Sequence, residues 1–154
     1  MKDRELYFVE REFAAPVERM WRAWTTASEL EEWYRPTVLT VLPGSVVSEA
    51  EAGGRWAVAV DVPMNDMVAY FWGRYADVIE NRRLEHSMSY SQDELEFIAR
   101  DDDAPAHRVV VGFTPTDRGT VVRYSQFGQM PDEQIEATRM GMTSYFNSLE
   151  AFLA

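Results

Sequence analysis

Apolar residues at strand spacing open the chain, and apolar residues at helical spacing follow them. Residues Leu6–Phe13 are rich in Tyr, Phe and Val and predict a first strand. Pro16 stands where a helix would place its first residue, because a missing N–H is of no consequence there. The spacing then predicts a helix with one apolar face, formed by Val17, Met20, Trp21 and Trp24.

A second, short helix is expected from Ser28 to Trp33. Ser28 is a good N-cap, and Glu31 follows three residues later, as in a capping box. Arg35-Pro36 ends this helix, because the residue before a proline avoids the helical conformation. We expect the tryptophans of the two helices to pin them against one end of the sheet: Trp21, Trp24 and Trp33.

From Thr37 to Phe127 the pattern changes to strands separated by turn residues. The expected strands are Thr37–Leu42, Val46–Glu51, Arg55–Val62, Met67–Ile79, Leu84–Tyr90, Arg108–Phe113 and Thr120–Phe127. Short links such as Asn81-Arg82 and the hairpin loop Pro115–Gly119 imply an antiparallel sheet. The acidic stretch between Ser91 and Ala106 is expected to be a mobile loop.

The chain ends in a long amphipathic helix. Pro131-Asp132 opens it, and acidic residues follow where the helix dipole favours them. Its apolar stripe consists of Ile135, Met142, Tyr145, Phe146, Leu149, Phe152 and Leu153. Helices that are separate in sequence from antiparallel strands imply the α+β class. No repeat or linker interrupts residues 1–154, so one domain is expected.

The charge balance is strongly acidic, with 26 Asp and Glu against 15 Lys and Arg and a formal net charge of −11. Nucleic-acid binders gather Lys and Arg on one face, and anionic membranes attract basic segments. The sequence therefore argues against nucleic-acid and membrane partners. The charged N-terminus is not followed by the apolar core of a signal peptide, so we expect a cytoplasmic protein.

Few residues could hold a metal ion or perform covalent chemistry. The chain has no cysteine, which excludes a thiol nucleophile and a thiolate metal site. His86 and His107 lack the short spacing of a metal-binding pair, and His107 is expected to begin a strand and face solvent. Asp101–Asp103 lack the spaced ligands and the glycine of a calcium loop. No metal and no cofactor are expected.

Several short motifs follow one another along nearly the whole chain. They are Arg11–Thr25, Leu30–Pro36, Gly53–Trp56, Gly73–Val78 with Arg83-Leu84, and Gly141 in the last helix. In this order they resemble the heat-shock-protein ATPase activator (Aha1-type) branch of the START-like (SRPBCC) proteins. The resemblance implies a helix-grip (START-like, Bet v-like) fold. In this fold a curved antiparallel sheet wraps around the long C-terminal helix, two short helices lie near the N-terminus, and a cavity separates sheet and helix.

The sequence departs from this branch at residues that would face the cavity. Met142 follows the helical glycine where tryptophan is common, His86 replaces an aromatic residue, and Met88 stands where tryptophan is frequent. Methionine adapts to irregular shapes, so these changes would soften and enlarge a cavity wall. The ligand of a relative is therefore not expected to carry over to this protein.

Period-two alternation in the strands places a set of side chains on the face toward the last helix. The candidates for lining a cavity are Trp56, Val58, Phe71, Tyr75, His86, Met88, Tyr90, Val122, Tyr124, Gln126, Met142 and Tyr145. Mostly apolar residues with sparse hydrogen-bonding groups are typical of small-molecule pockets. The alternative is that these residues form an ordinary core, since a sheet covered by a helix needs an apolar inner face in any case.

The sequence favours non-enzymatic binding of a small hydrophobic or amphipathic molecule, and it leaves two alternative functions. A co-chaperone-like domain could contact a chaperone or other protein through its acidic exterior. A cyclase, dehydratase or hydrolase could use His86 as general acid or base, because its ordinary pKa lies near neutrality. Alternatively, His86 is only hydrogen-bonded within the cavity wall and has no catalytic role. A homodimer is also compatible with the sequence.

Overall fold

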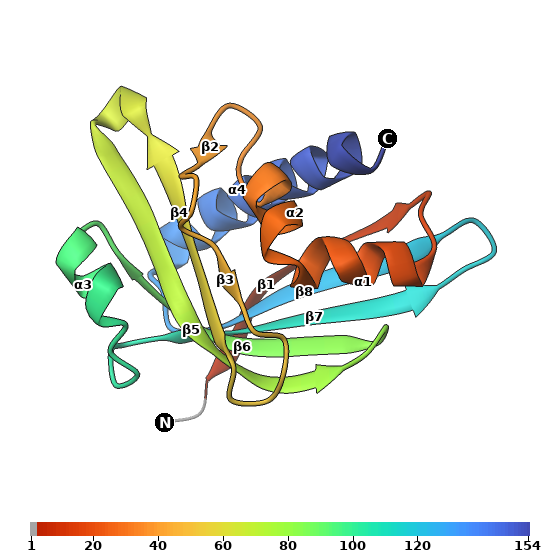
Figure 1. The fold of residues 1–154 in the computed structure, drawn as a ribbon, viewed down its shortest axis with the longest axis horizontal. Coiled ribbons are helices and arrows are strands. Elements are labelled where there is room, and N and C mark those ends of the chain that lie inside the picture. The colour runs from red at the N-terminus through yellow and green to blue at the C-terminus, as the bar shows by residue number, and fades with distance from the viewer. Residues whose placement is uncertain (1–2) are drawn as a thin grey trace.

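The computed structural model describes residues 3–154, and their helices and strands follow the predicted order (Figure 1). The strands are β1 (Arg4–Phe13), β2 (Thr40–Val41), β3 (Val47–Ser48), β4 (Arg55–Val62), β5 (Met67–Ile79), β6 (Arg83–Ser91), β7 (His107–Pro115) and β8 (Thr120–Gly128). The helices are α1 (Val17–Thr25), α2 (Ala27–Trp33), α3 (Glu94–Ala99) and α4 (Asp132–Leu153), with a short 3₁₀ turn, η1, at Pro63–Asn65.

The strands form one curled antiparallel sheet, and α4 lies along its concave face (Figure 1). The order is β1-β8-β7-β6-β5-β4-β2, with β3 also paired to β4. The first and last strands are neighbours in the sheet, because β1 pairs with β8. This pairing places Tyr7 opposite Gln126 and Val9 opposite Tyr124. The predicted α+β helix-grip fold is confirmed. Within residues 3–154 no helix combines the length and the apolar character needed to cross a bilayer.

The two short helices begin one residue away from their predicted starts. Pro16 is extended and is the N-cap of α1, whose first residue is Val17. Thr26 ends α1 by donating its N–H to the Arg22 carbonyl, and it is also the N-cap of α2. Because one residue joins both helices, Ser28 lies inside α2, and the predicted Ser28 cap is wrong.

Trp33 anchors α2 against α1 in the core. Its indole Nε1–H donates to the Ala23 carbonyl over 2.7 Å, and no part of its side chain is exposed. The Trp24 ring meets the Trp33 ring edge-on, with 4.7 Å between their centroids. These rings hold the two helices against the sheet, and α4 is tied to the segment after α2 by the Ser148 hydroxyl, which donates to the Arg35 carbonyl.

The stretch from Ser91 to Ala106 was expected to be a loop, but it contains α3. The Asp93 side chain accepts a hydrogen bond from the Leu95 N–H, which caps the helix and satisfies a free backbone donor. Phe97 is buried against Tyr70, with ring centroids 4.9 Å apart, on the sheet face opposite α4. Asp93 followed by Glu96 has the spacing of a capping box, so a signal for this helix was present.

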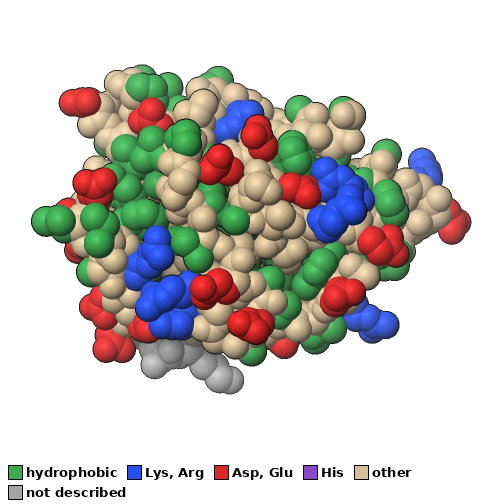
Figure 2. Space-filling view, viewed as in Figure 1, with side chains coloured by type: hydrophobic (Ala, Val, Ile, Leu, Met, Phe, Trp, Pro, Cys, Tyr) green, Lys and Arg blue, Asp and Glu red, His purple; other side chains and the backbone are tan. Residues whose placement is uncertain are grey.

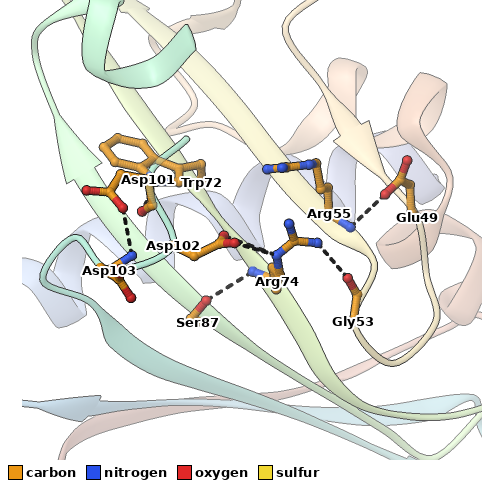
Figure 3. A network of polar contacts seen from close by, with 9 residues as sticks. All are labelled: Glu49, Gly53, Arg55, Trp72, Arg74, Ser87, Asp101, Asp102 and Asp103. Atoms are coloured by element: carbon orange, nitrogen blue, oxygen red, sulfur yellow. Dashed lines mark hydrogen bonds and ion pairs between the residues drawn. The ribbon is translucent and has the colours of Figure 1, made fainter. Parts of the chain in front are cut away.

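Polar contacts hold the acidic residues after α3 to the outer face of the sheet (Figure 3). Arg74 on β5 donates to the Asp102 carboxylate over 3.0 Å and to the Gly53 carbonyl over 2.9 Å. The Trp72 indole donates to the Asp101 carbonyl over 3.2 Å. The run Asp101–Asp103 lies in the stretch expected to be a mobile loop, and the structure pairs its middle residue, Asp102, with Arg74.

Candidate functional site

A cavity of about 820 Å³ lies between α4 and the concave face of the sheet. Its mouth is formed by exposed residues before β7, after β8 and in the first turns of α4, namely Pro105, Ala106, Gln129, Pro131 and Gln134. Its inner wall is aromatic and sulfur-rich, with Tyr7, Tyr34, Phe71, Met88, Tyr124, Met142 and Tyr145. The cavity therefore opens at the end where α4 begins and is closed by the core of the protein.

Seven of the twelve residues predicted from strand alternation lie at the wall of this cavity. They are Phe71, Met88, Tyr90, Tyr124, Gln126, Met142 and Tyr145. The remaining five are buried in the adjoining core and are not among the lining residues: Trp56, Val58, Tyr75, His86 and Val122. The apolar face of the sheet is thus divided between residues that line the cavity and residues packed in the core. Contact of the seven lining residues with a ligand remains a prediction.

His86 belongs to the buried group. Its ring stacks on Trp56 with 4.1 Å between centroids, and its Nδ1–H donates to the Ser87 carbonyl over 2.8 Å. Burial lowers the pKa of His86 from 6.5 to about 4 because the charged imidazolium would lose its hydration. The side chain is therefore neutral near pH 7 and acts as a packed aromatic ring.

Four tyrosines meet at the inner wall from four different elements. Tyr7 comes from β1, Tyr124 from β8, Tyr34 from the end of α2 and Tyr145 from α4. The Tyr7 and Tyr124 rings stack with 6.3 Å between their centroids, and the Tyr34 and Tyr145 rings meet edge-on at 5.0 Å. Burial raises the pKa of each of the four well above 10, so all four hydroxyls keep their protons.

A chain of hydrogen bonds leads from the inner wall to the mouth. The Tyr7 hydroxyl donates to Gln126 Oε1 over 2.5 Å, and Gln126 Nε2 donates to His107 Nδ1 over 2.6 Å. His107 Nε2–H then donates to the Gln129 carbonyl over 3.0 Å. Each side chain in this series of hydrogen bonds therefore has a partner within the protein. Within residues 3–154 no three His, Asp or Glu side chains gather as metal ligands would.

Three residues of the wall were not among those predicted from the sequence, namely Tyr7, Tyr34 and His107. His107 begins β7 as predicted, but its ring is half-buried and hydrogen-bonded to Gln126 where a solvent-facing side chain was expected. Gly128 permits this, since a Cβ at residue 128 would lie 2.4 Å from the His107 ring. Tyr7 shares a strand face with Val9 and Phe13, so alternation in β1 could have found it. Tyr34 follows the end of α2, and no periodicity marks it.

Gly141 lines the cavity from the middle of α4. A Cβ built on it would meet nothing within 4 Å, so packing does not require a glycine there. We expect Gly141→Ala to raise the free energy of unfolding by about 0.5–1 kcal/mol, because alanine restricts the unfolded chain and suits a helix. Urea unfolding of both proteins measures the change. A loss of stability would show that the helix needs this glycine for its own geometry.

Solved structures of other proteins share the fold of this chain. The AHSA1 protein from Silicibacter pomeroyi is 19% identical, with a TM-score of 0.79 over 96% of each chain. Proteins from Mycobacterium smegmatis and Chromobacterium violaceum are 22% and 21% identical, with TM-scores of 0.78 and 0.77. The former match covers 96% of this chain and 89% of the other, and the latter covers 94% of both.

No curated protein matches the sequence. The family model described as activator of Hsp90 ATPase homolog 1-like protein matches residues 14–154, which include both short helices, all strands after β1 and the whole of α4. The chain therefore belongs to the family of activator of Hsp90 ATPase homolog 1-like proteins.

Proposed function

We propose that this protein binds a small hydrophobic or amphipathic molecule in the cavity between the sheet and α4. The observation that carries the proposal is the cavity itself, an open-mouthed space of about 820 Å³ with an aromatic inner wall. Pockets for small molecules span roughly 300–1,000 Å³ and combine apolar walls with few polar groups. A core that served only for folding would be filled to the density of organic crystals.

The positions of the ionisable groups support binding over acid–base chemistry. His86 packs against Trp56 in the core, outside the lining residues, and its lowered pKa keeps it neutral. The inner tyrosines have raised pKa values and cannot serve as bases near pH 7. An enzyme that used His86 as its general acid or base would need that ring at the cavity wall.

Filling the cavity from α4 tests this proposal. Gly141→Phe places an aromatic ring where a Cβ meets open space. Ala137→Phe places the same ring one turn earlier, at an exposed residue that is not among the lining residues. A molecule present at 100 times its Kd adds about 2.7 kcal/mol, or roughly 5–10 °C in Tm for a domain of this size. We expect such shifts from sterols, fatty alcohols or aromatic amides with the wild type and Ala137→Phe but not with Gly141→Phe.

Two results would contradict the proposal. Equal shifts with Gly141→Phe would place the binding site elsewhere, and a panel without any shift would leave the cavity without a ligand. The Tm of each variant alone, measured without added compound, shows whether the new ring is accommodated in the fold.

Interaction with a chaperone is the second candidate, because the family is named for activation of the Hsp90 ATPase. On the face seen in Figure 2, acidic side chains are interspersed with basic and apolar ones and form no single acidic patch. Exposed apolar residues lie instead on α3, where Leu95 and Ile98 are 73% and 66% exposed. Stimulation of an Hsp90 ATPase by the wild type, lost in Leu95→Glu, would favour this candidate.

A further inference from the structure

The charge of the cavity wall restricts what the cavity can hold. Among residues 3–154, the lining includes neither lysine nor arginine, and its single carboxylate is that of Asp3 at the mouth. This carboxylate is already paired, since Arg108 Nε donates to Asp3 Oδ2 over 3.0 Å. An anion inside the cavity would therefore lose its hydration without gaining a cationic partner, and buried unpaired charges are strongly unfavourable.

Most polar groups of the wall are occupied by one another. The Tyr7 hydroxyl, the Gln126 amide and both ring nitrogens of His107 are joined in the hydrogen-bond chain that ends at the Gln129 carbonyl. A ligand would have to break protein hydrogen bonds to use these groups, and such an exchange contributes little net free energy.

The Tyr145 hydroxyl differs from these groups. It projects from α4 into the inner wall, where its ring meets Tyr34 edge-on with 5.0 Å between centroids. No side chain or backbone group of residues 3–154 forms a hydrogen bond with it. Tyr145 is half-buried and lines the cavity. Its proton stays in place, because burial raises the pKa of the phenol.

We propose that the cavity selects an uncharged molecule whose apolar body lies against the aromatic wall and whose polar oxygen accepts a hydrogen bond from the Tyr145 hydroxyl. This inference rests on the proposed function and adds to it the class of ligand. A carbonyl, amide or alcohol can accept a hydrogen bond from this donor. A carboxylate of the same shape is disfavoured by its charge, since the described lining includes neither lysine nor arginine and both ring nitrogens of His107 are already hydrogen-bonded.

Three compounds with one skeleton separate these requirements, namely biphenyl, biphenyl-4-carboxamide and biphenyl-4-carboxylate. Equilibrium dialysis at pH 7.5 measures their Kd, and the acid is fully ionised there. We expect the carboxamide to bind at least about tenfold more tightly than the carboxylate. Removing the carboxylate from water costs more free energy than one hydrogen bond to Tyr145 returns. The carboxamide should also bind more tightly than biphenyl.

Removal of one hydroxyl tests the assigned donor. Tyr145→Phe keeps the ring against Tyr34 and is expected to weaken carboxamide binding about five- to tenfold while leaving biphenyl binding unchanged, as loss of one hydrogen bond would. Tyr70→Phe is the matched control, because Tyr70 packs against Phe97 on the sheet face opposite α4 and does not line the cavity. We expect this variant to bind the carboxamide within about twofold of the wild type, since the change is made away from the cavity.

The outcomes distinguish this inference from the proposed function. Equal affinity for carboxylate and carboxamide, or an unchanged carboxamide Kd in Tyr145→Phe, would overturn the inference and leave binding in the cavity intact. Failure of all three compounds to bind would overturn both. Unchanged Tm values of the two tyrosine variants establish that altered affinity comes from the missing hydroxyl.

Discussion

Trp33→Ala is expected to lower the free energy of unfolding by about 3–5 kcal/mol, the usual loss when a large buried aromatic side chain is truncated in a core. Trp33 is fully buried, and its ring lies between Trp24 and Tyr34, with centroids 4.7 Å and 5.3 Å away. Its removal leaves a cavity and frees α2 from the Ala23 carbonyl. The melting temperature should fall by roughly 6–20 °C for a domain of this size.

A pair of milder substitutions separates the hydrogen bond from the packing. Trp33→Phe removes a bonded indole N–H and leaves the Ala23 carbonyl without it. Trp24→Phe removes an indole N–H that is buried and has no hydrogen-bond partner in the described part of the chain. We expect Trp24→Phe to be the less destabilising, because an unpaired buried donor is itself unfavourable. Equal losses in urea unfolding would mean that only ring volume matters.

Stability is expected to fall by about 3 kcal/mol between pH 6.5 and pH 4 through His86 alone, since each pKa unit corresponds to 1.36 kcal/mol. The pKa of His86 is about 4 in the folded protein and 6.5 as the ordinary value. In this window the unfolded chain binds the proton and the folded protein does not, so acid favours unfolding. Above pH 6.5 both states are neutral at this residue, and its contribution no longer changes.

The His86 contribution is measured as a difference between two proteins. His86→Phe removes the titrating group and keeps an aromatic ring against Trp56. Its free energy of unfolding, followed by urea titration from pH 4 to pH 7, should lose about 3 kcal/mol less than the wild type. His107→Gln, which removes the other histidine, should keep the loss that comes from His86. Parallel pH profiles for wild type and His86→Phe would contradict the assignment.

The strand and helix order could be read from residue spacing because each element has one apolar face. The long strand Met67–Ile79 and the opening of the last helix at Pro131-Asp132 agree with β5 and α4. The errors fall where two signals compete within a few residues. Thr26 both ends α1 and begins α2, and α3 was hidden in an acidic stretch although Asp93 and Glu96 carry a capping pattern.

The candidate site could be predicted only in part, because alternation assigns a side chain to a face and not to a position along the strand. Tyr75 and Phe71 share one face of β5, yet Phe71 lies at the cavity and Tyr75 is packed in the core with its hydroxyl hydrogen-bonded to Ser48. Tyr34 and His107 come from the ends of elements, where no period applies. Their places depend on contacts with α4 and β8.

The sequence by itself determined the α+β class, the order of the elements and the apolar inner face, because local spacing and turn residues specify these. It also supplied the resemblance that the family model bears out. Tertiary structure alone decided how much of that face is core and how much is cavity. That division depends on how α4 crosses the curled sheet and on how far the helix lies from the strands at each point. These elements are far apart in sequence, so local spacing does not specify their separation. The same packing buries His86 and leaves the Tyr145 hydroxyl facing the cavity.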